Sequence, residues 1–177
     1  MKKSILLLMV TVLLVTLTAC GAQDKKVNLQ KTGELYTTEE GVSFYYPSDY
    51  EISVSSNPEV TDYNTVEFNK DNNTLYFLVV NDESDNVASD KSELYTGVLE
   101  QGQASNIEVS KPVLNSGLDV YQYIYEYSDT GIKNKEIVYF LDDVTYIYGY
   151  RSVKDEFEKN EADMTVYLES FSMTAGK

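Results

Sequence analysis

The side chains that could perform chemistry are few in type. The chain contains no histidine and a single cysteine, Cys20. Without histidine it cannot form a Ser-His-Asp triad, a Cys-His pair or a histidine-ligated zinc site. Cys20 also has no second cysteine with which to form a disulfide inside the chain. The sequence therefore argues against enzymes that depend on a thiol or an imidazole, and it indicates no cofactor.

Carboxylates are the abundant chemical groups, with 29 Asp and Glu residues in the chain. Glycoside hydrolysis needs two of them facing each other, about 5 to 9 Å apart, and no spacing in the sequence marks such a pair. A hydrolase that uses carboxylates is therefore a third functional class, behind the two developed below.

The segment from Asp82 to Glu93 offers side-chain oxygens at most of the positions where a calcium-binding loop places them. Val87 stands where that loop needs a glycine, and the residues before Asp82 have the pattern of a strand rather than a helix. Asp90 and Glu93 equally fit a helix start, where Asp90 caps and an early acid favours the dipole. We favour the capping role and keep Ca²⁺ binding as an alternative.

Tyrosines form two rows of alternating residues, and the chain has 16 tyrosines and no tryptophan. Each row falls on one face of a strand by the two-residue period, and the two strands are expected to be neighbours. A solvent-facing ladder of these rings would suit a glycan or a protein partner. Alternatively, helices cover the rings as core, which agrees better with the frequent partial burial of tyrosine. The candidate binding residues are Tyr121, Tyr123, Tyr125 and Tyr127, and Tyr146, Tyr148 and Tyr150.

The N-terminal segment gives Cys20 a different role. Two lysines precede an apolar run over residues 5–17, and small residues follow up to Cys20, which is the pattern of an export signal. The segment resembles a bacterial lipoprotein signal peptide. The resemblance implies that residues 17–20 are the lipobox, that residues 1–19 are removed, and that the sulfur of Cys20 receives a diacylglyceryl group.

Two other interpretations of this segment fit less well. A membrane-spanning helix needs about 20 apolar residues, and the apolar run here is shorter. An ordinary secretory signal would leave Cys20 as a free thiol in a compartment where cysteines are usually paired. Because two acyl chains are enough for stable anchoring, we expect a lipid-anchored protein on the extracytoplasmic face of the cell membrane, with the bilayer as its first partner.

The net charge of the chain limits the classes of molecule that it is expected to bind. The net charge is −15, so nucleic acid is not an expected partner, because binding it relies on basic groups that neutralise phosphates. The same charge repels anionic lipid headgroups, within a screening length of about 8 Å at physiological salt.

Composition divides the mature chain into two parts. Residues 20–38 are polar and are expected to form a flexible tether. Residues 39–177 have the size of one ordinary domain and contain no internal repeat.

Strand patterns dominate this domain, and two helical patterns interrupt and close it. The first two strands are expected to form one hairpin and the next two another, and short connections require antiparallel pairing. Ser152 and Asp155 approximate a cap for the final helix. The pattern predicts an α+β fold, an antiparallel β-sheet covered by helices. The expected strands are Val42–Tyr46, Glu51–Val54, Val66–Asn69, Leu75–Val80, Ile107–Val113, Val120–Tyr127, Glu136–Leu141 and Val144–Tyr150, and the expected helices are Asp90–Gly102 and Val153–Met173.

Two short motifs resemble a known family. Phe44 to Tyr50 resembles the opening F-x-Y-P-x-x-W of PsbP-like domains, with Tyr50 in place of the tryptophan. Leu168 to Phe171 resembles their closing segment, which commonly ends in Ser-Phe. The resemblance implies a PsbP-like sandwich over residues 40–174. That family includes photosystem extrinsic subunits, Ran-binding proteins and bacterial lipoproteins, so the shared fold does not transfer an activity.

We therefore expect a non-enzymatic, membrane-anchored lipoprotein that binds or stabilises another component of the cell envelope, either a protein or a glycan. The alternative is capture of a small ligand, a glycan or Ca²⁺, by the tyrosine face or by the segment from Asp82 to Glu93.

Overall fold

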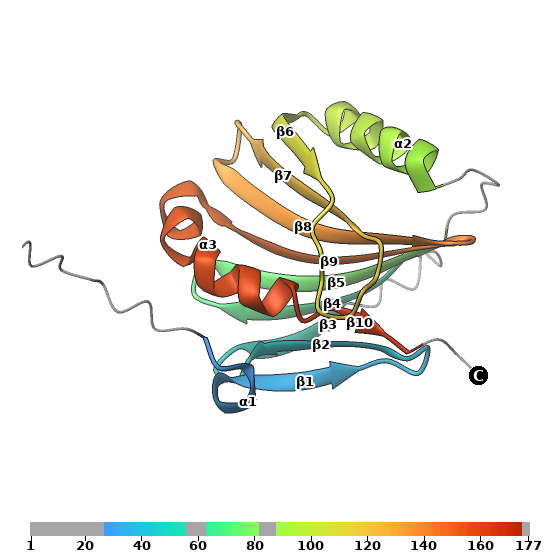
Figure 1. Ribbon diagram of the computed structural model, residues 1–177. Coiled ribbons are helices and arrows are strands. Elements are labelled where there is room, and N and C mark those ends of the chain that lie inside the picture. Colours follow the sequence, from blue (N-terminus) through green and yellow to red (C-terminus); the bar gives the residue numbers. More distant parts are fainter. Residues whose placement is uncertain (1–26, 56–62, 82–87, 175–177) are drawn as a thin grey trace, which may run out of the picture.

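Two antiparallel sheets organise the chain. The computed structural model describes residues 27–55, 63–81 and 88–174 (Figure 1). The larger sheet has seven strands in the order β3-β4-β5-β9-β8-β7-β6. They are β3 (Glu51–Ser55), β4 (Tyr63–Lys70), β5 (Asn73–Asn81), β6 (Ala104–Ser110), β7 (Tyr121–Tyr127), β8 (Ile132–Leu141) and β9 (Val144–Val153).

A smaller sheet and three helices complete the described fold. The small sheet has the order β1-β2-β10, with β1 (Gly33–Thr37), β2 (Val42–Pro47) and β10 (Ser172–Met173). The helices are α1 (Leu29–Thr32), α2 (Ala88–Gln101) and α3 (Lys154–Leu168). In Figure 1 α3 and the small sheet lie together on one side of the large sheet, while α2 lies apart beside β6 and β7. In the described part of the chain, no helix has the length and apolar character needed to cross a membrane.

The main core lies between the large sheet and the layer formed by α3 and the small sheet. Aromatic rings fill it: Phe44 of β2 stacks on Tyr148 of β9 with ring centroids 4.1 Å apart, and Tyr150 stacks on Phe157 of α3 at 5.1 Å. All four side chains are fully buried. Burial of such large rings on one face fixes the register of β9, because a slip of one residue would move them to the other face.

The two motifs that resemble PsbP-like domains meet in this core. Phe44 and Phe171 are both fully buried in it. The backbone N–H of Tyr45 donates to Oγ of Ser170 over 2.8 Å. Tyr50, which replaces the family's tryptophan, is half-buried and its hydroxyl contacts the sulfur of Met164 at 3.8 Å. Segments about 125 residues apart in the sequence thus close one side of the sandwich.

Two features near the N-terminus differ from the prediction. The segments predicted as a first hairpin, β2 and β3, belong to different sheets: β2 pairs with β1 and β10, and β3 pairs with β4. The partner of β2 comes from the stretch predicted as tether, since residues 29–37 form α1 and β1. The prediction failed because β1 is short and mostly exposed, so its composition is that of a linker.

The C-terminal helix is shorter than predicted. α3 ends at Leu168, and the residues after Ser170 turn to form β10 on the edge of β2. The predicted cap is also wrong. The N-cap position is Val153 without a side-chain hydrogen bond, and the Ser152 hydroxyl instead donates to the carbonyl of Asn72 over 2.9 Å. Ser152 is a strand residue that ties β9 to the turn before β5.

The remaining elements agree with the prediction in type. β4 and β5 form the predicted second hairpin, and every pair in both sheets is antiparallel. β6 begins three residues before its predicted start, at Ala104, and ends at Ser110. Asp90 lies in the first turn of α2 rather than at its cap, because the helix begins at Ala88. The α+β fold class with an antiparallel sheet and covering helices is confirmed.

Candidate ligand-binding site

The two tyrosine rows do not form one ladder. β8 lies between β7 and β9, and the register places the rows on opposite faces of the sheet. The β9 row, Tyr146, Tyr148 and Tyr150, belongs to the core beneath α3 and the small sheet. The β7 row, from Tyr121 to Tyr127, faces α2, and all but Tyr127 are buried. The prediction of a shared face was wrong because the register aligns Tyr121 with Val138 and Val138 with Ile147, so the tyrosines of β9 fall at the alternate positions.

Three of the fully buried rings have hydroxyls that bond inside the protein. Tyr148 donates to the carbonyl of Tyr45 and Tyr150 to the side-chain oxygen of Asn73, each over 2.7 Å. Tyr123 donates to the backbone carbonyl of Ser92 in α2 over 3.1 Å. These tyrosines therefore serve as core, which is the arrangement that strand propensity favoured.

A row of residues that runs across the strands of the large sheet positions the polar groups of the face toward α2. The register places Glu67 of β4 opposite Tyr76 of β5, Tyr76 opposite Gly149 of β9, and Gly149 opposite Glu136 of β8. Residues that face each other in adjacent strands point to the same side of the sheet. The row thus brings two carboxylates and one phenol to the open side of the large sheet.

Gly149 allows Tyr76 to reach Glu136 across an intervening strand. A Cβ at Gly149 would lie 2.3 Å from Cζ of Tyr76 and 2.6 Å from its hydroxyl oxygen. The ring therefore lies directly over the glycine, and a glycine inside a strand often marks this kind of close approach. A side chain at position 149 would therefore force the ring of Tyr76 out of its present place beside Glu136.

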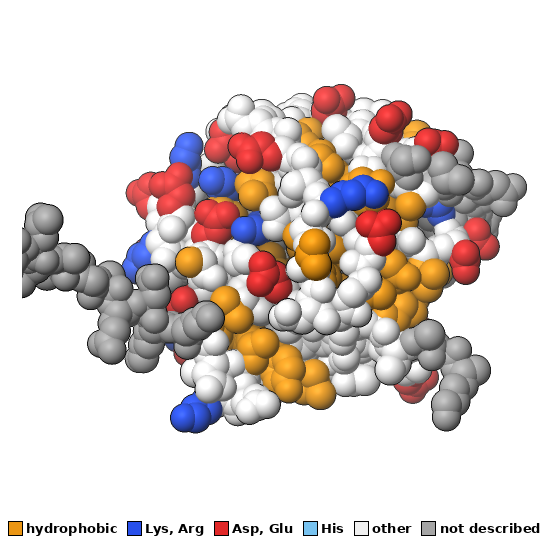
Figure 2. Space-filling view, viewed as in Figure 1, with side chains coloured by type: hydrophobic (Ala, Val, Ile, Leu, Met, Phe, Trp, Pro, Cys, Tyr) orange, Lys and Arg blue, Asp and Glu red, His pale blue; other side chains and the backbone are white. Residues whose placement is uncertain are grey.

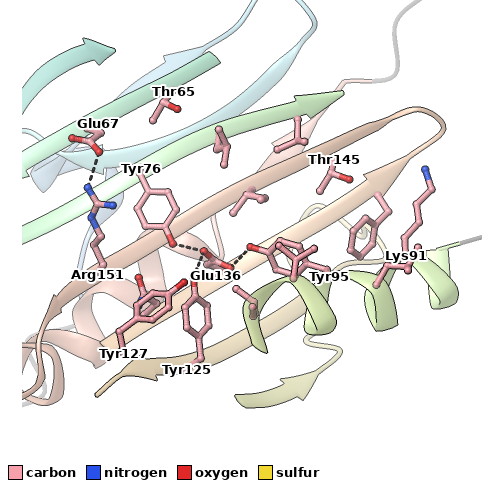
Figure 3. A pocket seen from close by; sticks show the side chains of 18 residues that line it. Thr65, Glu67, Tyr76, Lys91, Tyr95, Tyr125, Tyr127, Glu136, Thr145 and Arg151 are labelled. Carbon is pink, nitrogen blue, oxygen red and sulfur yellow. Dashed lines mark hydrogen bonds and ion pairs between the residues drawn. The ribbon is translucent and has the colours of Figure 1, made fainter. Parts of the chain in front are cut away.

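Glu136 accepts hydrogen bonds from three tyrosines on three different elements (Figure 3). Tyr95 of α2 donates to one carboxylate oxygen over 2.7 Å, and Tyr125 of β7 donates to the other over 2.8 Å. Tyr76 of β5 donates to the same oxygen as Tyr125. The carboxylate is 3 % exposed. One buried acid thus joins α2, β5 and β7 to β8.

Burial controls the protonation of this cluster. It raises the pKa of Glu136, while the three phenol hydrogen bonds and the charge of Arg151 oppose that rise. Burial and the neighbouring Glu136 charge raise the pKa of Tyr76 and of Tyr95 well above the ordinary value. The phenols therefore stay protonated and act as donors to the carboxylate.

Arg151 of β9 is engaged beside this cluster. Its guanidinium forms an ion pair with Glu67 at 2.7 Å and lies over the ring of Tyr76, 5.3 Å from the centroid. Among the described residues, Glu136 itself forms no ion pair. The groups that hydrogen-bond to its carboxylate are neutral phenols, which is an uncommon arrangement for a buried carboxylate.

A groove of about 710 Å³ lies between α2 and the open half of the sheet. One end is polar and contains Glu136, Arg151 and Glu67. Leu94 and Val98 of α2 are 56 % and 60 % exposed where they line it. The apolar part of its lining is completed by the side chains of Leu78, Val80, Leu99, Phe140 and Ile147. The groove is therefore amphipathic, and two of the predicted tyrosines, Tyr125 and Tyr127, line it.

The other predicted sites are only partly within the described residues. Cys20 lies outside them, so its lipidation remains a prediction. The first half of the segment from Asp82 to Glu93 also lies outside them, while Asp90 and Glu93 are part of α2. Within the described ranges, no group of three or more acidic, cysteine or histidine side chains is arranged to hold a metal ion.

Sequence reasoning missed Glu136, Tyr76, Tyr95 and Arg151 as site residues. Two signals pointed to them. Glu136 is a charged residue beside an apolar run in a predicted strand, and Gly149 interrupts a strand otherwise rich in tyrosine. Neither signal identifies the partners, because Tyr76 and Tyr95 come from elements far away in the sequence.

Comparison with known proteins supports the fold. No protein-family model matches the sequence, and no curated protein matches it. The structure is similar to the solution structure of cyanobacterial PsbP (CyanoP) from Synechocystis sp. PCC 6803, with a TM-score of 0.61 and 15 % identity, covering 89 % of this chain and 99 % of that one. The fold is PsbP-like.

Two further solved structures are more distant. PA94 from Pseudomonas aeruginosa, a protein of unknown function, has a TM-score of 0.48 and 11 % identity, covering 78 % of this chain and 94 % of its own. LpqN, involved in cell envelope biogenesis of Mycobacterium tuberculosis, has a TM-score of 0.46 and 14 % identity, covering 80 % and 90 %. These two similarities are too low to support a conclusion. At 15 % identity the PsbP likeness concerns the fold alone.

Proposed function

We propose that this protein is a non-enzymatic, extracytoplasmic lipoprotein that binds a small amphiphilic molecule in the groove between α2 and the large sheet. The observation that supports this most directly is the groove itself, with a polar end at Glu136 and an apolar wall that includes exposed Leu94 and Val98. Small-molecule sites are typically concave and mostly apolar, with a few placed polar groups. The apolar wall suits an amphiphile better than a glycan, which was one of the ligands expected from the sequence.

The arrangement of acids argues for binding rather than hydrolysis. Glu67 and Glu136, the two acids that line the groove, stand three strand intervals apart in the sheet, which is about 14 Å between their backbones. Tyr76 lies between them, and Glu67 is held by Arg151. Paired carboxylates in glycosidases face each other across about 5 to 9 Å with the substrate between them.

The membrane anchor belongs to the same proposal. A lipid on Cys20 would hold the domain beside the bilayer, where amphiphilic molecules are concentrated. The first described residue, Val27, lies seven residues after Cys20, so the anchor and the domain are close in the sequence. The proposal thus combines a predicted location at the membrane with a groove suited to the amphiphilic molecules of the bilayer.

The test is to ask whether an amphiphile travels with the protein. The protein is purified from its own membrane and studied by non-denaturing mass spectrometry, together with a variant carrying Leu94→Gln and Val98→Gln. We expect a bound small molecule on the wild type and its loss from the variant. The control carries Leu35→Gln and Val109→Gln, which change two apolar side chains of 57 % and 45 % exposure outside the groove. Equal loading of all three proteins, or no loading of the wild type, would contradict the proposal.

A further inference from the structure

The chemistry of the polar end specifies the class of ligand, given the proposed function. We propose that the groove takes an amphiphilic amine, with a positively charged ammonium head at Glu136 and its tyrosines and an apolar chain along Leu94 and Val98. Three observations support a cation in place of an anion or a neutral alcohol.

The first observation is the balance of charge. The polar end contains two carboxylates, Glu67 and Glu136, and one guanidinium, Arg151, which is already paired with Glu67 at 2.7 Å. Lys91, the other cation of the lining, lies at the far end of the groove, where its ammonium donates to the carbonyl of Asp142 (Figure 3). Glu136 is left as a carboxylate without a cationic partner among the described residues. An ammonium group would supply that partner, whereas a carboxylate or phosphate head would face a second negative charge.

The second observation is the direction of the hydrogen bonds. Tyr76, Tyr95 and Tyr125 all use their hydroxyl protons on Glu136. Their oxygens therefore offer only acceptor lone pairs to anything that enters the groove. An ammonium head has three N–H donors and no acceptor, so it complements this set of groups.

The third observation is the aromatic surroundings of the carboxylate. Tyr76, Tyr95, Tyr125 and Tyr127 all line the groove around Glu136 (Figure 3). Aromatic faces attract cations, and the attraction increases when the cation is removed from water. Arg151 already lies over one of these rings, at 5.3 Å from the centroid of Tyr76, so the groove holds a cation–π contact of its own.

The charge of the whole protein acts in the same direction. The net charge is −15, and Figure 2 shows acidic side chains spread over the visible face with hydrophobic groups between them. A field of this sign concentrates cations near the surface and raises their rate of association.

The experiment compares three probes that share one apolar chain and differ in the head: n-octylammonium, 1-octanol and octanoate. Binding to the full chain in lipid nanodiscs is measured by titration calorimetry near pH 7.5, with empty nanodiscs as the blank. A hydrogen bond to a charged group contributes about 1.5 to 3 kcal/mol, so we expect the ammonium to bind roughly ten- to hundredfold more tightly than the alcohol. Octanoate should bind most weakly.

Glu136→Gln should reduce the affinity for the ammonium to that for the alcohol, so that the variant no longer distinguishes the two heads. The control Glu126→Gln makes the same change on the opposite face of β7, where the carboxylate lies 3.6 Å from Lys154, and should keep the wild-type preference. The comparison of heads in the wild type does not depend on either variant.

The outcomes separate the two proposals. If the alcohol or octanoate binds the wild type as tightly as the ammonium, and the variant with Leu94→Gln and Val98→Gln weakens that binding, the amine is the wrong ligand and the groove remains a binding site. If the wild type binds none of the three probes, or if that variant binds all of them as well as the wild type does, both proposals are wrong.

Discussion

The ring of Tyr76 lies directly on Gly149, so that the only space for its Cζ is the space that a side chain at position 149 would occupy. This contact crosses a whole strand: Tyr76 belongs to β5, Gly149 to β9, and the carboxylate that Tyr76 reaches, Glu136, belongs to β8. The glycine therefore contributes by the room that it leaves, and the hydrogen-bond cluster of the groove depends on it.

The first prediction tests this dependence. Gly149→Ala places a Cβ 2.3 Å from Cζ of Tyr76, so the ring must move and its hydrogen bond to Glu136 must break. We expect a loss of about 1 to 3 kcal/mol in the free energy of unfolding, which is typical of an overpacked site. Urea denaturation measures this loss, and near-ultraviolet circular dichroism should show a changed tyrosine signal.

The matched control is Gly97→Ala. Gly97 lies inside α2, and nothing stands within 4 Å of a Cβ added there. Because alanine is the better helix former, this variant should be more stable than the wild type by roughly 0.5 to 1 kcal/mol. If both variants change stability by the same amount and in the same direction, Tyr76 does not depend on Gly149.

The second prediction concerns the pH dependence of stability. Burial raises the pKa of Glu136 above its ordinary value of 4.5, so the folded chain holds this proton more tightly than the unfolded chain. Its contribution to the free energy of unfolding is fully present below pH 4.5, falls as the pH rises through the folded pKa, and stays lower above it.

Glu136→Gln removes this contribution. Between pH 7.5 and 5, wild-type stability should gain relative to that of the variant as the pH falls, as measured by urea denaturation at several pH values. Glu126→Gln controls for the loss of one carboxylate, and it should follow the wild type more closely than Glu136→Gln does. Parallel curves for the wild type and Glu136→Gln would show that Glu136 is not held in an environment that favours its protonated form.

The third prediction separates the donors to Glu136. Tyr95→Phe removes one hydroxyl that donates to the carboxylate over 2.7 Å and leaves the ring in place. A hydrogen bond to a charged group contributes about 1.5 to 3 kcal/mol, so stability near pH 7 should fall by an amount in this range. Combined with Glu136→Gln, the loss should shrink, and a double-mutant cycle measures the coupling. Tyr36→Phe is the control, since the Tyr36 hydroxyl makes no hydrogen bond among the described residues; a loss there as large as for Tyr95→Phe would contradict the assignment.

Local patterns were sufficient to predict the strands of the large sheet and their antiparallel direction. Alternation placed β7 and β9 correctly, and the short turn between β4 and β5 gave the right hairpin. The same local reasoning failed at β2. Its partner β1 lies in a polar stretch, and β10 lies beyond the end of α3, so neither contact has a signal in the sequence near β2. Pairing between distant segments is decided by the burial of Phe44 and Phe171, which only the assembled core reveals.

The groove was beyond prediction for a related reason. Alternation correctly placed the tyrosines of β7 on one face, but the strand order decides which residues stand beside them. Glu136 meets Tyr76 and Tyr95 only because β9 lies between β5 and β8 and because α2 crosses the same face. The sequence alone therefore shows the residues of the cluster but does not show which of them lie next to one another in the fold.

The fourth prediction tests the core that joins the two sheets. Phe44 is fully buried and stacks on Tyr148 at 4.1 Å, so Phe44→Ala should cost about 3 to 5 kcal/mol in the free energy of unfolding. Leu35→Ala, on the neighbouring strand β1 at 57 % exposure, should change stability by less than about 1 kcal/mol. Urea denaturation of both variants makes the comparison, and similar losses would mean that β2 does not anchor the small sheet.

The fifth prediction concerns Cys20, on which the proposed location of the protein depends. If its sulfur carries a diacylglyceryl group, Cys20→Ala leaves the chain without the acyl chains that anchor it, each buried methylene of which contributes about 0.8 kcal/mol. We expect the wild type in the membrane fraction of its native cells and a larger share of the variant outside it, as measured by fractionation and immunoblotting. Mass spectrometry of the wild type should find an acylated residue 20 at the N-terminus. An unmodified Met1 start, or a variant that stays with the membrane to the same extent, would mean that another feature holds the protein there.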